Sequence, residues 1–164
     1  MARAFVSIGS NIERERNVRA AVAALRHRFG TLQLSRVYQN RPIGFDGEDF
    51  YNLVVGFDTS EPPEAVAAIL HDIEQQQGRV RGPSKFSARS LDLDLLLYDN
   101  LVRDDEQLRV PRDEIREYAC VLGPLAELAP EGKHPETGET FTQMWARFPP
   151  SRQQLIAVEL SLDG

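Results

Sequence analysis

The stretch RSLDLDLLLYD, residues 89–99, has the pattern of a buried strand that contains two carboxylates. Side chains alternate between the two faces of a strand, so Asp92 and Asp94 are expected on one face, followed by Leu96 and Tyr98. The other face is expected to hold a row of leucines: Leu91, Leu93, Leu95 and Leu97. We therefore predict a strand that enters the core from a cleft, with both carboxylates at the cleft end.

The segments before and after this strand carry the periodicities of a mixed α and β fold. Alternating or β-rich segments predict further strands at residues 3–11, 31–39 and 50–59. Apolar residues at helical spacing predict one helix that ends before Gly30 and another within residues 60–78. Two short helices and a last strand are expected at residues 121–130, 141–148 and 154–160.

The order up to Asp99 is βαββαβ, which is the order of a ferredoxin-like α+β sandwich. We expect an antiparallel sheet with helices packed on one face, and additional C-terminal helices. The 164 residues suit one domain, 1–164, and no repeat or linker interrupts them.

The bulk composition excludes several classes of protein. A net charge of -6 and a pI near 5.1 argue against a nucleic-acid or anionic-membrane surface. No apolar span or signal peptide is found, so a cytoplasmic protein is expected, as a monomer or small homo-oligomer. The lone Cys120 forms no internal disulfide, and the scattered histidines give no structural zinc spacing.

One loop departs from the acidic balance. Residues 78–91, GRVRGPSKFSARSL, contain Arg79, Arg81, Lys85 and Arg89 and no acid. Residues 79–89 of this stretch are one of three irregular segments, together with residues 40–49 and 99–114. Long loops in a small domain are more often functional than simple connections.

The paired acids allow two interpretations. Residues two apart on a strand lie about 6.6 Å from each other, which lets two carboxylates hold hard cations such as magnesium together with phosphate oxygens. Alternatively, Asp92 and Asp94 lie on a solvated face and pair with nearby arginines. The basic loop directly before the two acids favours the first interpretation, a site for a metal ion together with a polyphosphate. The chain lacks G-x-x-x-x-G-K-[ST] and G-x-G-x-x-G, so a nucleotide would bind through side chains and metal.

Several motifs resemble, in order and spacing, one family of folate synthesis. They are GSN after the first strand, RPIG before FYN, IEQQQGRVR, ARSLDLDLLLYD and VLGPLAELAP. The family is 6-hydroxymethyl-7,8-dihydropterin pyrophosphokinase, and the resemblance covers roughly residues 4–130.

The resemblance implies an ATP-dependent enzyme and a role for each matching residue. Asp92 and Asp94 would hold two Mg²⁺ ions between ATP and the hydroxymethyl oxygen of the pterin. The implied ATP-binding residues are His71, Glu74, Arg79, Arg81, Lys85, Arg89 and Arg112, of which Arg79 and Arg89 would be catalytic with the two aspartates. The implied pterin-binding residues are Asn40, Pro42, Ile43, Phe50 and Asn52.

The chain departs from the family in one half of the implied pocket. Arg112 stands where the family usually has histidine, Tyr118 where it has arginine, and Cys120 where a phenylalanine covers the pterin ring. In the basic loop, Phe86 replaces a frequent tryptophan and Ser87 a usual glycine. These changes suggest an altered substrate preference, so a related pterin is a possible substrate.

Two further functions stay open from the sequence. One is a pterin- or nucleotide-binding paralogue without transfer activity that serves as a regulator or partner subunit. The other is a metal-dependent phosphohydrolase. Purely structural roles for single residues also stay open. Asn52 would then hydrogen-bond backbone groups, Phe50 would be a core residue and His71 an exposed helical side chain.

Overall fold

The structure is a computed structural model, and it describes residues 1–41, 48–77 and 91–162. The first part of the chain forms β1 (Ala2–Ser10), α1 (Arg14–Phe29), β2 (Gln33–Leu34), β3 (Val37–Asn40), β4 (Phe50–Thr59), α2 (Pro63–Gln77) and β5 (Asp92–Tyr98). The second part forms β6 (Arg103–Asp104), β7 (Arg109–Val110), α3 (Glu114–Glu117), α4 (Ala119–Leu128), α5 (Phe141–Arg147), a 3₁₀ turn (Pro150–Arg152) and β8 (Ile156–Val158).

The main sheet has the strand order β5-β1-β4-β3-β8, with β2 also paired to β4, and its pairs are antiparallel. The βαββαβ order and the antiparallel sheet confirm the predicted ferredoxin-like α+β sandwich. The last predicted strand is also confirmed, because β8 pairs with β3. That residues 1–164 form one domain stays a prediction.

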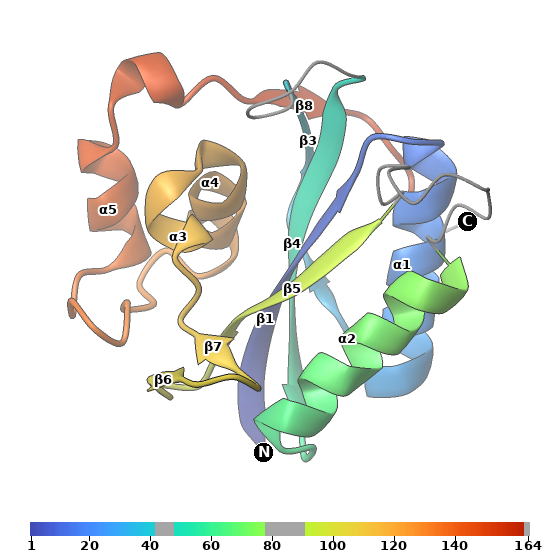
Figure 1. Cartoon of the computed structure of the whole chain (residues 1–164). Helices are drawn as coiled ribbons and strands as arrows, with labels where there is room; N and C mark the ends of the chain where they lie inside the picture. The colour runs from blue at the N-terminus through green and yellow to red at the C-terminus, as the bar shows by residue number, and fades with distance from the viewer. Residues whose placement is uncertain (42–47, 78–90, 163–164) are drawn as a thin grey trace.

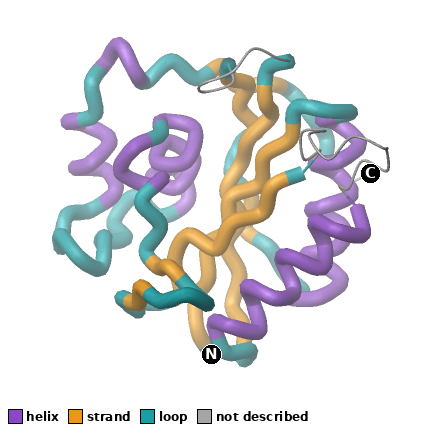
Figure 2. Tube along the Cα trace, viewed as in Figure 1, coloured by secondary structure: helices purple, strands orange, loops and turns teal. Residues whose placement is uncertain are grey.

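Helices lie on both faces of the sheet. Figure 1 shows α1 and α2 on one side and α3, α4 and α5 on the other, and Figure 2 shows the strands between these two helical layers. The sequence predicted helices on one face and additional C-terminal helices. The tertiary structure shows that these later helices form a second covering layer.

The predicted strand 31–39 is wrong in one respect, because it is broken into β2 and β3 at Ser35. The Ser35 backbone N–H donates to the Val54 carbonyl at 2.9 Å, while its hydroxyl oxygen accepts from the Val54 N–H at 2.9 Å. A side chain thus replaces a backbone acceptor in the ladder, which interrupts regular pairing.

The predicted alternation in the opening stretch fails after Leu96. Phe5 pairs with Leu97 and Val6 with Leu95, so Leu96 is the additional residue of a β-bulge. Leu96 and Leu97 both pack with the α3–α5 layer, whereas Tyr98 packs against the α1–α2 core. Leu97 is therefore not on the face of Leu91, and Tyr98 is not on the face of Asp92.

The segment 99–114 is less irregular than predicted. It contains the β6–β7 hairpin and leads into α3. In the described part of the chain, no helix has both the length and the apolar character needed to cross a membrane.

Candidate active site on the open half of the sheet

A row of neighbouring residues crosses the sheet at the end of β1. Gly9 pairs with Asp92 on one side and with Asn52 on the other, and Asn52 pairs with Tyr38. Directly paired residues of adjacent strands project to the same face. This face is the one toward the α3–α5 layer, because Val54, two residues beyond Asn52, belongs to that apolar cluster.

Asp94 lies on the same face, one step further along β5, opposite Ser7. Both aspartates are partly buried, and 40% of the Asp94 side chain is exposed. The flanking Leu93 and Leu95 are buried in the opposite core. The carboxylates are therefore neither split between the two faces nor aimed entirely into solvent.

Arg112 brings a positive charge to this pair. Its Nη1 lies 3.8 Å from Asp94 Oδ1, its Nε donates to the Glu114 carboxylate, and its backbone N–H donates to the Leu96 carbonyl at 3.1 Å. Burial disfavours the charged guanidinium, but the Glu114 hydrogen bond and the charge of Asp94 together raise the Arg112 pKa. Arg112 thus stays a cation beside Asp94.

Two of the residues implied in ATP binding lie near the C-terminal end of α2. Glu74 reaches the edge of the sheet, where its Oε2 accepts from the Leu93 N–H at 2.9 Å. His71 is 59% exposed, and its Nδ1 lies 3.6 Å from Glu74 Oε1. Glu74 is thereby fixed next to the acidic strand, and His71 lies one helical turn earlier on the surface.

Three of the residues implied in pterin binding come together on β3 and β4. Asn40 pairs with Phe50 in the ladder, and Asn52 Nδ2 donates to the Asn40 Oδ1. An added Cβ on Gly9 would lie 2.8 Å from Asn52 Oδ1, which is closer than real Cβ contacts. The absence of a side chain at Gly9 therefore leaves the space that the Asn52 amide occupies. A glycine inside a strand often marks such a close approach, and this sequence signal could have identified Gly9 as a site residue.

The remaining site residues expected from the sequence lie outside the described residues. They are Pro42, Ile43, Arg79, Arg81, Lys85 and Arg89, with Phe86 and Ser87 of the same loop.

A cavity of about 300 Å³ lies between β3, the start of α4 and the C-terminal segment. Its lining includes Asn40, Tyr118, Cys120, Arg152 and Leu155. Burial raises the pKa of the Cys120 thiol to about 11, so this cysteine is a neutral, apolar side chain. Tyr118 and Cys120 thus lie next to Asn40, and Arg152 and Leu155 are lining residues that sequence reasoning missed.

The carboxylates fit a hard divalent cation that shares its coordination with a ligand. Among the residues described here, no group of three or more His, Cys, Asp or Glu side chains is arranged to hold a metal ion. Asp92 and Asp94 provide oxygen donors from one partly exposed face, and Gly9 adds no side chain beside Asp92. Mg²⁺ is typically bound by one or two carboxylates, with water and phosphate oxygens completing its shell.

The fold and the site together define an α+β sandwich that presents paired carboxylates and side-chain amides on the half-covered face of an antiparallel sheet. Residues 5–130 match the family model of 7,8-dihydro-6-hydroxymethylpterin-pyrophosphokinase. The chain belongs to this family.

Curated relatives carry the corresponding enzyme name, 2-amino-4-hydroxy-6-hydroxymethyldihydropteridine pyrophosphokinase. The protein from Bacillus subtilis is 34% identical, over 87% of this chain and 89% of its own length. Those from Pseudomonas aeruginosa and Methylorubrum extorquens are each 35% identical, with coverage of 90% and 92% of this chain and 92% and 96% of their own lengths.

Solved structures show the same fold at low sequence identity. A crystal structure of HPPK-DHPS in complex with substrates matches 89% of this chain and 45% of its own chain, with a TM-score of 0.71 and 13% identity. Wild-type Plasmodium falciparum HPPK-DHPS matches with a TM-score of 0.68 and 13% identity, over 89% and 44% of the two chains. This likeness concerns the fold.

Proposed function

We propose that this chain transfers pyrophosphate from ATP to the hydroxymethyl group of 6-hydroxymethyl-7,8-dihydropterin and releases AMP. Membership of the pyrophosphokinase family supports the reaction. In this reaction, the hydroxymethyl oxygen forms a bond to the β-phosphorus of ATP. The bond from that phosphorus to the oxygen bridging it to the α-phosphate breaks, and the hydroxyl proton is released.

The observation that supports this function best is the row across β5, β1 and β4. Asp92 and Asn52 flank Gly9 on the same face, so two strand spacings, about 10 Å, separate their backbones. A flat heterocycle held at Asn52 would therefore extend toward a phosphate group held near Asp92. Gly9 leaves the space between them free of a side chain.

Two Mg²⁺ ions are proposed at Asp92 and Asp94. When bound there, they would neutralise the phosphate oxygens and polarise the phosphorus for attack. The two carboxylates hold this charge at one end of the sheet face. Arg112, fixed by Glu114, contributes a further positive charge for the phosphate oxygens.

The other roles follow the side-chain chemistry. We assign Glu74, His71 and the basic residues Arg79, Arg81, Lys85 and Arg89 to ATP, with Arg79 and Arg89 as catalytic cations. Asn52 and Asn40 would hydrogen-bond the edge of the pterin, Phe50 would lie against its plane, and Pro42 and Ile43 would complete the pocket. The expected partners are these small molecules only, in a cytoplasmic monomer or small homo-oligomer.

The test is incubation of the purified chain with ATP, Mg²⁺ and 6-hydroxymethyl-7,8-dihydropterin, followed by chromatographic separation of nucleotides. Pterin-dependent AMP is expected, in a 1:1 ratio with pyrophosphorylated pterin. ADP or free phosphate would instead favour a phosphohydrolase. Tight pterin binding without AMP would favour the inactive binding paralogue, for which no observation on the described residues argues.

A further inference from the structure

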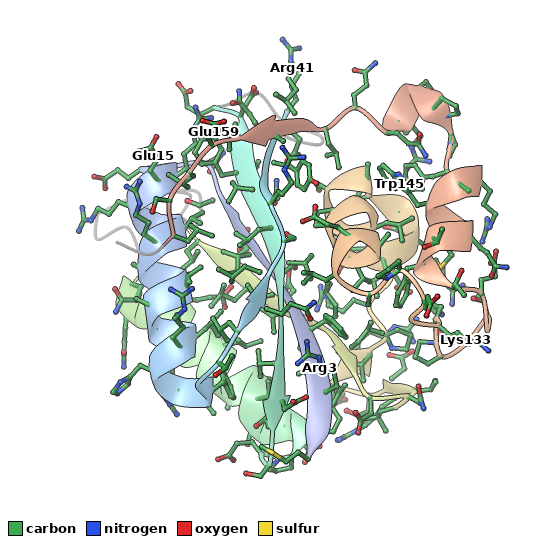
Figure 3. The ribbon with its side chains drawn as sticks, turned by 180° about the vertical axis from the view of Figure 1, so that it is seen from behind. Arg3, Glu15, Arg41, Lys133, Trp145 and Glu159 are labelled. Atoms are coloured by element: carbon green, nitrogen blue, oxygen red, sulfur yellow. The ribbon has the colours of Figure 1, made fainter. Side chains whose placement is uncertain are left out.

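The C-terminal segment lies outside residues 5–130, yet it lines the cavity next to Asn40. Figure 3 shows this segment running from α5 over the edge of the sheet toward α1. Its place in the molecule is fixed at three positions, so it can contribute a defined wall.

The first fixed position is on the helical layer. Arg152 Nη2 donates to the Glu117 carbonyl at 2.5 Å, and Gln153 Nε2 donates to the Trp145 carbonyl at 2.6 Å. The Arg152 guanidinium also lies over the Phe148 ring, 5.1 Å from its centroid. These contacts hold residues 152–153 against α3 and α5.

The second fixed position is on the sheet. Ile156 pairs with Gln39 and Ala157 with Tyr38, so β8 extends the sheet directly beside Asn40. Beyond β8, Arg19 Nε donates to the Ser161 carbonyl at 2.8 Å and Arg26 Nη1 to the Leu162 carbonyl at 3.3 Å. The chain is therefore anchored on both sides of residues 154–155.

The third fixed position is Leu155, whose side chain packs against Gly123 of α4. A Cβ added to Gly123 would lie 2.8 Å from Leu155 Cδ1 and 3.1 Å from the Trp145 ring, so only a glycine allows this approach. Glycine is unfavourable inside a helix, and here its missing Cβ leaves the space that the Leu155 side chain occupies. Cys120 lies one turn earlier on the same helical face as Gly123, and both Leu155 and Cys120 line the cavity.

We propose that residues 152–155 form the outer wall of the pterin subsite, and that Leu155 with Cys120 determines the shape of the ring pocket. This inference rests on the proposed function. The cavity combines the apolar surfaces of Leu155, Cys120 and Ala119 with polar and charged groups around them, namely Asn40, Arg41, Glu117, Tyr118, Arg152 and Gln154. A planar heterocycle with polar edges is complementary to such a lining, because its faces need apolar contact and its edges need hydrogen bonds. Leu155 is thus a specificity-determining residue for the substrate ring.

The test compares Leu155→Ala, Leu155→Trp and the volume-conserving Leu155→Met. Ile156→Ala is the matched control, since Ile156 is the next residue, is 65% exposed and is not part of the cavity lining. The measurements are the Kd for 6-hydroxymethyl-7,8-dihydropterin with Mg²⁺ and a non-hydrolysable ATP analogue present, the KM values for both substrates, and the unfolding temperature.

Leu155→Ala is expected to raise the Kd and KM for the pterin about threefold to tenfold, because apolar contact is lost from one face of the ring. Leu155→Trp should raise them further by filling the cavity, while Leu155→Met and Ile156→Ala should stay within about twofold of the parent. The KM for ATP should not change.

Pterin Kd and KM values within about twofold of the parent for both Leu155→Ala and Leu155→Trp would overturn the inference. Equal increases in the KM for ATP and the pterin, accompanied by a lower unfolding temperature, would also overturn it in favour of a structural role. If the unmodified chain binds the pterin but forms no AMP, the proposed function is contradicted and the inference about Leu155 is not. The Kd values of the Leu155 variants still test whether residues 152–155 form a wall of the pterin subsite.

Discussion

The two faces of the sheet have different compositions although the same strands build both. The face under α1 and α2 is apolar along most of its length, with buried residues from β1, β4 and β5 such as Ile8, Leu53 and Leu93. The other face is apolar only where the α3–α5 layer covers it, around Val54 and Leu96. Its remaining half carries carboxylates and amides.

The two faces contribute differently to stability and to chemistry. Burial of apolar area is the dominant favourable term in folding, so the closed face provides most of the stabilisation. Polar groups left partly uncovered cost little, because water solvates them until a ligand replaces it. The half-covered face can therefore hold a site without a large loss of stability.

The strongest test of the difference is Asp94→Asn. The change keeps the side-chain shape but removes one of the two charges proposed to hold Mg²⁺, so kcat/KM for pyrophosphate transfer should fall about 10³-fold while the urea midpoint changes little. Asp104→Asn is the control, since this carboxylate is 72% exposed on β6 and outside the proposed site. A transfer rate for Asp94→Asn within tenfold of the parent would contradict the assignment.

A core truncation on the closed face should have the opposite effect, a loss of stability with little change in kcat/KM. Leu25 in α1 is fully buried, and Leu25→Ala should lower the free energy of unfolding by about 3 kcal/mol through lost contacts and a residual cavity. The kcat/KM of the remaining folded protein should stay within about twofold, measured well below the unfolding temperature. A comparable loss of activity in the fully folded variant would show that the two faces are not separable.

Gly9→Ala tests the boundary between the carboxylates and the amides on the half-covered face. The added Cβ would lie only 2.8 Å from Asn52 Oδ1, so the Asn52 amide must move. The KM for the pterin should therefore rise about tenfold, with a small change in stability. In a double-mutant cycle, Gly9→Ala should have little further effect in an Asn52→Ala background. Additive effects would show that Gly9 acts elsewhere.

The smallest expected effect concerns the covering layer. His134, in the segment that joins α4 to α5, is buried, and burial followed by the charge of Arg116 lowers its pKa below the ordinary 6.5. The other charged groups that act on it are Arg109, Glu136 and Glu139. The unfolded chain therefore takes up a proton first, so stability is fully present above pH 6.5 and decreases as the pH falls through this value.

The expected result is a lower urea midpoint at pH 5 than at pH 7.5, and a smaller difference in His134→Gln. His27→Gln on the exposed end of α1 serves as the control and should keep the parent's difference. An unchanged pH dependence in His134→Gln would exclude His134 as the titrating group.

The placement of the acidic pair could be predicted because its two residues lie close together in the sequence. Asp92 and Asp94 share a face for the elementary reason that strand side chains alternate, and the structure has them so. The bulge at Leu96 could not be predicted in this way, because it is a property of the pairing with β1. It changed the faces of Leu97 and Tyr98 while it left the acids in place.

The pairing of Arg112 with Asp94 could not be predicted from the sequence either, because the contact depends on how distant segments fold together. The sequence shows an arginine after a loop and places it among cations for ATP, but only the folded chain brings its Nη1 to 3.8 Å from the carboxylate. The contribution of Glu114, which holds the guanidinium, gave no sequence signal at all.

The order of the elements, the acidic pair and the family resemblance can be inferred from the amino-acid sequence, because periodicity and short motifs depend on neighbours along the chain. The folded chain is needed to see which residues share the sheet face across strands, how the later helices cover part of it, and that Leu155 reaches the cavity beside Asn40. The physical reason is that strand register and packing join residues far apart in sequence, where no local pattern records the partner.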